Sequence, residues 1–461
     1  MKRFEAELTP VREPGGIGRM HVRLTLFGAD ARAGDELARI RRRTVGVPGA
    51  EPLGTAVSDE LGALPFVLKE WEEYPVCYLG VYAGRAARGP VVIEYDVAVG
   101  SRPDHGRHGP YFEWAAESGG VSGPGFAFLM APAGFSGALS LVWHRERLEE
   151  GDRCVCTWGE GNLALDGPAG LLTDCYYMLG PVRSVTEGEF GLYWLTEPDF
   201  DAQSLAAFTR DLFARMQAFF LDDRQVYRVF MREDHTETSG GTALRRSYMF
   251  GWNRRRQVSQ VKRQILLAHE MVHNWPHLND EPYGVTTWYS EGTAEYYSLL
   301  LALRAGLISR EQALRELQER TDAYYTNPTR HLSNMEAARA AWEDRRAQRL
   351  SYGRGLFYLA GADRRIRRAS GGRVSLDDVV RALILKDRQG VTLGNQVYLD
   401  TVRGLCGLDE TEALHAMCEG KDFAPDADSL DALFTVTPYD TAEQDTGKPA
   451  VSYRWGLRRE R

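Results

Sequence analysis

The sequence predicts a multidomain α+β protein with an N-terminal β-sheet domain, a central α/β domain and a C-terminal all-helical domain. Its 461 residues exceed the usual size of one domain and favour about three. Apolar residues alternate at every second position in the first part, whereas they recur every three or four residues in the later parts. We place the domain boundaries at residues 1–190, 191–305 and 306–440, and we expect a tail over residues 441–461.

Short alternating runs between glycine-rich and proline-rich turns predict the N-terminal β domain. The clearest runs are HVRLTLF, VVIEYDVAV and ALSLVW, at His21–Phe27, Val91–Val99 and Ala138–Trp143. A strand turns successive side chains to opposite faces, so each run has one face to bury. The loop-like segment after the second run contains His105 and His108, which we interpret as solvent-exposed because no partner lies at a metal-binding spacing.

The apolar period changes after residue 199. A following amphipathic helix is predicted by apolar residues at intervals of three and four, namely Leu205, Phe208, Leu212, Met216 and Phe219. The next apolar run, VYRVFMR at residues 226–232, predicts a strand, which we expect at the edge of its sheet. The α/β region therefore begins here.

Beyond residue 291 the pattern is almost wholly helical. Two helix starts carry a capping box, in which a residue three positions after a serine completes the cap: Ser309 with Gln312, and Ser375 with Asp378. The residues after 440 lack periodicity, which predicts a loose tail.

Composition and charge exclude several classes of partner. The formal net charge is -8 and the sequence pI is 5.8, so the protein repels nucleic acid and anionic membranes, and we expect neither as a partner. No apolar run approaches the length of a membrane span, and the N-terminal residues lack the apolar core of a signal peptide. We therefore expect a cytoplasmic protein. The six scattered cysteines do not predict a disulfide framework.

Positive charge gathers in one stretch near the C-terminal domain. We interpret it as a solvated helix face, because helical charge runs are commonly of this kind. Its members are Arg345, Arg346, Arg349, Arg354, Arg364, Arg365, Arg367 and Arg368.

The segment QILLAHEMVH contains the motif HExxH. His269 and His273 are four residues apart, so both imidazoles lie on one face of a helix and can bind one ion. Glu270 lies beside them, where it can act as general base on a water molecule. The alternative is a pair of histidines that is simply packed in a core. The motif favours a metal site with one Zn²⁺ ion.

Catalytic zinc needs a third protein ligand and an open position. A histidine ten residues after the first would be typical of metzincins, but Asn279 stands there and His277 is two residues short. Glu291, eighteen residues after the second histidine, lies in the helical pattern WYSEGTAEYY. A turn at Pro282 and Gly284 would join two antiparallel helices and bring this carboxylate back over the histidines. We predict Glu291 as the third ligand.

These motifs resemble two families of gluzincin zinc metallopeptidases. HEMVHNW followed by WYSEG is similar to the aminopeptidase N family and to the glycyl aminopeptidase family, family sixty-one. Three further segments favour the second family, namely residues 141–162, 240–247 and 351–367. The resemblance covers roughly residues 130 to 420. Relatives often append a PDZ domain for which this chain is too short, so we expect a PDZ-less bacterial-type member.

The resemblance implies a thermolysin-like catalytic domain between the β domain and the helical domain, and a peptide or small-protein substrate. It also implies a role for Tyr352, because SYGRG matches the place where relatives carry a tyrosine that donates to the tetrahedral oxyanion. The segment GGTALRRS resembles the substrate-binding strand of the family, which implies contacts from Gly240, Gly241, Thr242 and Ala243.

Ala243 departs from the family pattern, since aminopeptidase relatives have there a glutamate that binds the free amino group of the substrate. The residues Asp234, Glu237 and Glu295 are possible substitutes. Aminopeptidase specificity is therefore not expected from the sequence alone. Glu295 and Asn274 are otherwise second-shell candidates that orient metal ligands, and surface positions are the alternative. Two other functions stay open: a zinc hydrolase of a non-peptide bond, and a catalytically silent peptide-binding relative. The oligomeric state also stays open.

Overall fold

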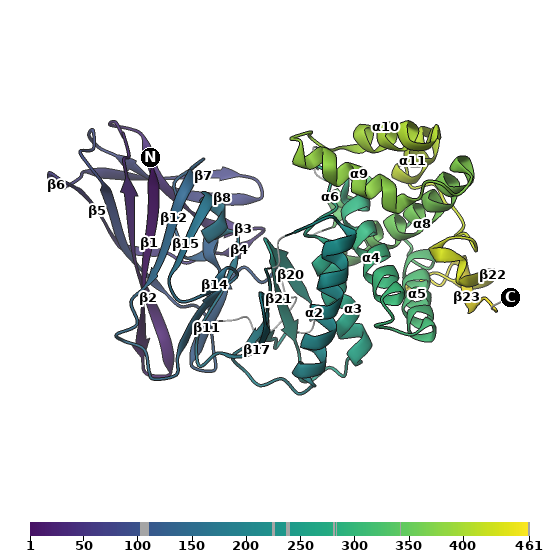
Figure 1. The fold of residues 1–461 in the computed structure, drawn as a ribbon, viewed down its shortest axis with the longest axis horizontal. Coiled ribbons are helices and arrows are strands. Elements are labelled where there is room, and N and C mark those ends of the chain that lie inside the picture. The colour runs from purple at the N-terminus through teal and green to yellow at the C-terminus, as the bar shows by residue number, and fades with distance from the viewer. Residues whose placement is uncertain are drawn as a thin grey trace. The chain divides into compact units, whose positions relative to one another are not determined.

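The computed structural model describes residues 1–101, 110–223, 226–236, 240–279, 282, 284–341 and 343–459. The predicted loop histidines His105 and His108 lie outside these residues, as does Glu237. The chain folds into two compact units, Met1–Ala206 with Gln225–Gln257 and Ala207–Arg224 with Val258–Arg461. Strands make up most of the first unit and helices most of the second, which confirms a multidomain α+β protein (Figure 1). The finer domain boundaries remain predictions.

Three sheets form the N-terminal part of the first unit. The largest contains β1 (Arg3–Glu13), β2 (Gly16–Phe27), β5 (Pro52–Asp59), β6 (Gly62–Ala63), β9 (Val91–Ala98), β12 (Ser136–Trp143) and β15 (Leu163–Pro168). Its order is β15-β12-β1-β2-β9-β5-β6. The second contains β3 (Glu36–Thr44), β4 (Val47–Pro48), β7 (Phe66–Glu73) and β8 (Val76–Ala83), in the order β4-β3-β8-β7.

The third sheet contains β10 (Ala115–Glu117), β11 (Gly120–Pro124), β13 (Arg153–Cys156), β14 (Gly159–Glu160) and β16 (Tyr176–Gly180). Its order is β10-β11-β16-β13-β14. Two short helical turns accompany it, η1 (Gly125–Ala127) and α1 (Gly170–Thr173). The three alternating runs predicted from the sequence coincide with β2, β9 and β12, so these predictions are confirmed.

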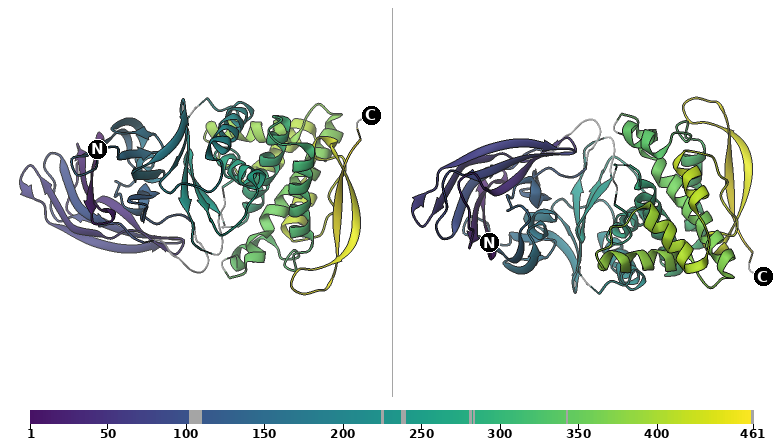
Figure 2. Two further views of the ribbon diagram at one scale, coloured as in Figure 1. Left: turned by 90° about the horizontal axis from the view of Figure 1, so that it is seen from below. Right: turned by 90° about the horizontal axis from the view of Figure 1, so that it is seen from above.

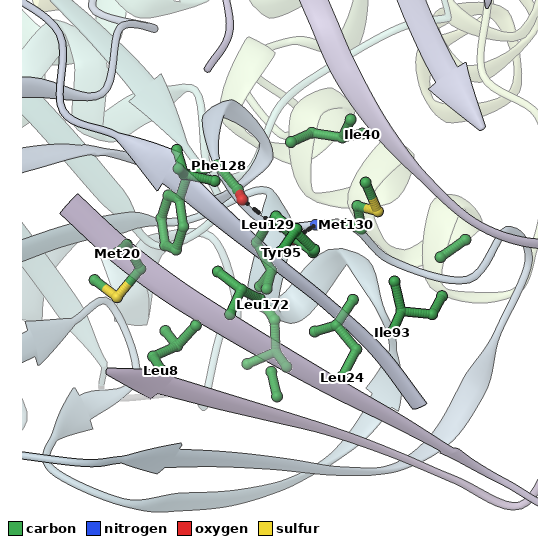
Figure 3. Close-up of a cluster of buried hydrophobic side chains, with 14 of the residues drawn as sticks. Leu8, Met20, Leu24, Ile40, Ile93, Tyr95, Phe128, Leu129, Met130 and Leu172 are labelled. Atoms are coloured by element: carbon green, nitrogen blue, oxygen red, sulfur yellow. Dashed lines mark hydrogen bonds between the residues drawn. The ribbon is translucent and has the colours of Figure 1, made fainter. Parts of the chain in front are cut away.

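A large apolar core explains the alternation in these strands. Inward-facing residues of β2 and β9, among them Leu24 and Ile93, are completely buried, as Figure 3 shows. Tyr95 is buried in this core with its hydroxyl group satisfied, because it donates to the carbonyl oxygen of Phe128 (3.2 Å) and accepts from the amide of Met130 (2.8 Å). Each large apolar side chain contributes roughly 1.5–3 kcal/mol on burial.

A fourth sheet contains β17 (Arg183–Glu187), β18 (Phe190–Trp194), β19 (Tyr227–Glu233), β20 (Gly241–Leu244) and β21 (Ser247–Trp252). Its order is β17-β18-β19-β21-β20. The strand predicted at residues 226–232 is β19, but its prediction as an edge strand was wrong. Strand β19 pairs in parallel with both β18 and β21, so both of its backbone edges are occupied. Strand β20 forms that end of the sheet instead.

The helices are α2 (Ala202–Phe219), α3 (Gln260–Val272), α4 (Thr287–Arg304), α5 (Arg310–Tyr325), α6 (Asn334–Ala340), α7 (Arg345–Gln348), α8 (Leu350–Ser370), α9 (Leu376–Arg388), α10 (Asn395–Cys406), α11 (Thr411–Cys418) and η2 (Leu430–Ala432). The amphipathic helix predicted after residue 199 is α2. Both predicted capping boxes are confirmed, at the start of α5 and at the start of α9. Within the described part of the chain, no helix has the length and apolar character needed to cross a lipid bilayer.

The prediction of a loose tail and an all-helical C-terminal domain was wrong. Strands β22 (Phe434–Ala442) and β23 (Pro449–Leu457) form an antiparallel hairpin, visible in yellow beside the helices in Figure 2. Strand β23 packs on α5, where Trp455 Nε1 donates to Thr321 Oγ1 at 2.8 Å and Gln318 Nε2 donates to the carbonyl oxygen of Tyr453 at 2.9 Å. The inward face includes the polar Ser452, so the segment lacked a clear apolar alternation.

Candidate metal centre

Helix α3 carries the first histidine and the neighbouring glutamate in its last turn. Its N-cap residue is Ser259, whose side chain accepts a hydrogen bond from the amide of Lys262 (3.2 Å). His273 caps its C-terminal end in a right-handed helical conformation, so it keeps the four-residue spacing from His269. The rings of the two histidines lie 5.0 Å apart, centroid to centroid. The apolar face of the helix is buried through Ile265, Leu267, Ala268, Met271 and Val272.

Helix α4 brings Glu291 to the two histidines. A tight turn precedes this helix, and Gly284 has a φ of 93° there, which glycine adopts without strain. The Glu291 Oε2 atom lies 3.2 Å from His269 Nε2 and 3.8 Å from His273 Nε2. One nitrogen from each ring and one carboxylate oxygen all lie within 4.8 Å of one another.

This donor set fits a zinc ion. Two imidazole nitrogens and one carboxylate oxygen are the ligands of catalytic zinc in one well-known class of site, and three protein ligands leave a position for water or substrate. Atoms that each lie about 2 Å from one ion are separated by roughly the distances seen here. The structure therefore brings together the three side chains that the sequence nominated.

A chain of buried charges extends behind the first histidine. Glu295 Oε1 lies 3.2 Å from His269 Nδ1, and the guanidinium group of Arg320 donates to the second oxygen of Glu295. Arg320 also donates to Glu316 Oε2 at 2.8 Å. Burial alone would lower the pKa of His269, but the hydrogen bonds to Glu291 and Glu295 outweigh it and raise that pKa to about 10. Glu295 lies where it can orient the His269 ring, and this role remains a prediction.

Burial is the main cause of the pKa shifts of Glu270 and His273. Burial raises the pKa of the Glu270 carboxyl group to about 7, because the charged form loses its hydration. Burial lowers the pKa of His273 to about 4, so this imidazole is neutral at neutral pH. A neutral imidazole is the form that binds a metal ion.

Tyr352 lies against the same site. Its ring is stacked on that of His269, with centroids 5.6 Å apart and planes within 7°. The negative charge of Glu291 and burial raise the pKa of Tyr352 well above its ordinary value, so the hydroxyl group stays a neutral donor. Helices α4 and α8 approach closely because Gly292 meets Gly355, where a Cβ atom on Gly292 would lie 2.5 Å from the backbone of Gly355. This close approach brings Tyr352 near Glu291.

Residues 262–362 match the M61 glycyl aminopeptidase family. They contain both histidines, Glu270, Glu291 and Tyr352. This segment of the chain is therefore similar to M61 peptidases. Together with the donor set of the zinc type described above, it makes the chain a metallopeptidase, which is a hydrolase. Among curated proteins, none matches the sequence.

Solved structures share the fold of nearly the whole chain. An aminopeptidase N family protein from Idiomarina loihiensis superposes with a TM-score of 0.70 at 15% identity, over 97% of this chain and 81% of that chain. An M1 zinc metallopeptidase mutant from Deinococcus radiodurans, bound to a Tyr-Ser-Ala substrate, superposes with a TM-score of 0.55 at 15% identity, over 92% and 95%. At such identities the similarity shows the fold alone.

Three further residues named in the sequence analysis lie near the metal centre, each in a different environment. Asn274 Nδ2 donates to the carbonyl oxygen of Met271 at 2.8 Å, which supports the end of α3, and its role in orienting ligands remains a prediction. His277 pairs with Asp387 at 3.5 Å, as suits a loop residue. Both oxygens of Glu295 already have partners, His269 and Arg320, and its role as a substitute for the amine-binding glutamate remains a prediction.

The predicted substrate-binding residues lie in the first compact unit, on and just before β20. A Cβ atom on Gly241 would lie 1.6 Å from Tyr248 Oη, so glycine is required there for packing. Thr242 Oγ1 accepts a hydrogen bond from the amide of Tyr111 at 3.0 Å. Asp234 is already engaged, since it accepts from Tyr111 Oη at 2.7 Å and from the amide of Thr236 at 2.8 Å. Substrate binding by Gly240, Gly241, Thr242 and Ala243 remains a prediction.

Sequence reasoning missed two arginines of the helical unit, the half-buried Arg320 and the buried Arg354. Arg320 had no motif to mark it, although its partner Glu316 stands one helical turn earlier. Arg354 belongs to the arginine stretch that was predicted to be a solvated helix face, but its side chain is only 1% exposed. The glycines on either side of it, which let α8 pack closely, were the available signal.

Proposed function

We propose that the chain is a zinc-dependent peptidase in which His269, His273 and Glu291 hold one Zn²⁺ ion and Glu270 is the general base. The observation that carries this proposal is the convergence of three metal-binding atoms within 4.8 Å beside a half-buried glutamate and a neutral tyrosine hydroxyl. When bound, zinc supplies Lewis acidity that makes water a better nucleophile and polarises the scissile carbonyl.

Glu270 transfers the protons of the reaction. Its pKa near 7 lets the carboxylate accept a proton from the attacking water and return it to the leaving amine at neutral pH. Glu270 is half-buried on α3 and adjacent in sequence to His269, so its carboxyl group is held beside the reacting centre. A group whose pKa matches the working pH is an efficient donor and acceptor in turn.

Tyr352 stabilises the negative charge that develops on the carbonyl oxygen. Its hydroxyl group remains protonated because the pKa is raised well above its ordinary value. Stacking on His269 restricts the motion of the ring. A positioned neutral donor stabilises an oxyanion without reorganisation during the reaction.

The proposed mode of substrate binding rests on the free edge of strand β20 and on the family resemblance. Strand β20 has one free edge among the described strands, so it can pair with an extended peptide. A structural neighbour with a bound Tyr-Ser-Ala substrate supports a peptide as the substrate. Because Ala243 replaces the amine-binding glutamate, we expect no requirement for a free N-terminus.

The test compares blocked and unblocked peptides with wild-type protein and the Glu270→Gln variant. We expect the zinc-loaded wild type to cleave both kinds of peptide at similar rates, and the variant to bind peptides without cleaving them. Cleavage of unblocked peptides alone would show that the protein requires a free N-terminus, as an aminopeptidase does. Turnover of esters or epoxides without any peptide cleavage would favour a non-peptide hydrolase, and binding without turnover in the wild type would favour a silent peptide-binding relative.

A further inference from the structure

A pocket lies beside the proposed zinc site within the helical unit. Its volume is 120 Å³, and Glu291 and Tyr352 form part of its wall. The other lining residues come from the turn before α4 and from α4, α6, α7 and α8. Because the pocket shares two side chains with the reacting centre, a group that occupies it must belong to a residue next to the scissile bond.

Small side chains create the space. Helix α6 and its C-terminal end contribute Ala337, Ala338 and Ala341, and α7 contributes Ala347. Asn334 and Gln348 add amide groups to the lining. The volume and the mixed lining fit one polar side chain of moderate length better than a large aromatic ring.

Arg354 gives this pocket a buried positive charge. Its Nη1 donates to Asn334 Oδ1 at 2.6 Å, and its Nη2 donates to the carbonyl oxygens of Arg330 (2.7 Å) and Leu332 (2.6 Å). Among the described residues no carboxylate forms an ion pair with it, and Nε lacks a hydrogen-bond partner. A buried cation that is compensated only by neutral acceptors is costly, and an anion in the pocket offsets that cost.

A second arginine adds positive charge at the same place. Arg349 stands in sequence between the lining residues Gln348 and Ser351, and its guanidinium carbon lies 5.4 Å from the centre of the Tyr352 ring. Its side chain is exposed, and no ion pair to it is formed within the described ranges. Of the nearby carboxylates, Glu291 faces the metal site and Glu295 pairs with Arg320, whereas Glu270, the proposed base, interacts electrostatically with Arg349.

We propose that this pocket binds the carboxylate side chain of a glutamate or aspartate next to the scissile bond, with Arg354 and Arg349 as specificity-determining residues. The inference rests on the proposed peptidase function and names its substrate class. It extends that function, since the chain selects peptides by an acidic side chain at this position. Asn334 is a positioning residue, because it holds the Arg354 guanidinium group.

The test uses blocked alanine-based hexapeptides that carry a single glutamate or glutamine at each successive position. Glutamate and glutamine have nearly the same size, so a difference in kcat/KM reports charge. We expect glutamate to exceed glutamine by at least about tenfold at one position flanking the cleaved bond. The preference should fall as the ionic strength rises, because salt screens exposed charge.

Three variants separate the pocket from the rest of the surface. Arg349→Gln should lower the glutamate-to-glutamine ratio without unfolding the protein, because this arginine is exposed and only Arg354 then remains to favour the charge. Ala341→Leu should fill the pocket and lower kcat/KM for glutamate more than for alanine. Arg368→Gln is the matched control, since Arg368 is an exposed arginine on the same helix outside the pocket lining, and it should keep the wild-type ratio.

A binding measurement keeps the two proposals distinguishable. Zinc-loaded Glu270→Gln protein should bind the glutamate peptide about tenfold more tightly than the glutamine peptide, as measured by calorimetry. Cleavage of both peptides at equal rates in the wild type would overturn the acidic preference and leave the peptidase function standing. If no hexapeptide were bound or cleaved, the peptidase function would fail and the substrate class with it.

Discussion

The two buried centres of this chain are built in opposite ways. The core of the β-rich unit is mainly apolar, and a polar group within it, the Tyr95 hydroxyl, is satisfied by two backbone partners (Figure 3). The centre of the helical unit buries charge instead, in the line from Arg320 through Glu295 to His269. Apolar burial stabilises a fold wherever it occurs, whereas buried charges are tolerated only when each has a partner. The first centre therefore governs stability, and the second governs chemistry.

The largest expected effect is at Glu270. The substitution Glu270→Gln removes the base while it keeps the shape of the side chain, so kcat should fall by about 10³-fold. Bound zinc and the unfolding midpoint should not change, because Glu270 is not among the three converging ligand residues. Peptide cleavage assays and metal analysis on one preparation check this. A variant that retains more than a tenth of the wild-type kcat would mean that another group accepts the proton.

The matching change in the apolar core is Leu24→Ala. Leu24 is completely buried, so the free energy of unfolding should fall by about 3 kcal/mol, from the lost apolar contacts and the cavity left behind. At a temperature where the variant is folded, its zinc content and kcat should equal those of the wild type. Urea denaturation together with activity assays tests both halves. If kcat fell with stability intact, the separation of roles between the two centres would be wrong.

Tyr352→Phe should have the next largest effect. The phenyl ring can keep the stacking on His269, while the hydroxyl donor is lost. We expect kcat to fall by about 10²-fold with little change in KM, because the hydrogen bond forms to the oxyanion rather than to the bound substrate. Steady-state kinetics on a blocked peptide measures both constants. A change confined to KM would assign Tyr352 to substrate binding.

The smallest expected effect is the release of a proton from His269 when zinc binds. In the metal-free protein the pKa of His269 is raised to about 10, so the imidazole is protonated at pH 8.5. Zinc binds the neutral form, and its uptake at this pH should therefore release about one proton from His269. His273, with a pKa of about 4, is already neutral and should release none. Calorimetry in buffers of different ionisation enthalpy counts the protons.

The variant Glu295→Gln provides the control for this count. It removes one of the three carboxylates, those of Glu270, Glu291 and Glu295, that raise the pKa of His269, so fewer protons should be released at pH 8.5. Release that is unchanged in the variant would show that the line of charges behind the first histidine does not control its ionisation.

Local patterns predicted the elements that depend on nearby residues. The spacing of His269 and His273 follows from helix geometry, and the capping boxes and the alternating strands are also local signals. Glu291 could be nominated because a turn and a second helix follow directly in sequence. Tyr352 came only from the family resemblance, since 61 residues separate it from Glu291 and the contact depends on how α8 packs on α4.

The sequence-based errors have a common physical origin. Strand β19 was predicted at a sheet edge, but strand order depends on pairing between distant segments. The hairpin of β22 and β23 was predicted as a tail because its inward face includes Ser452, whose partner is Asp322 on α5. Arg354 was predicted to be solvated, although it hydrogen-bonds to carbonyl oxygens more than twenty residues earlier. Such long-range contacts leave no periodic trace in the sequence.

The most direct test of the account is the zinc content of purified wild-type protein beside the Glu291→Ala variant, measured by elemental mass spectrometry. We predict about one zinc ion per chain in the wild type, and loss of most of it in the variant, because three protein ligands are needed to hold catalytic zinc. A wild-type protein that contains no zinc and takes none up would contradict the three-ligand site and the peptidase mechanism built on it.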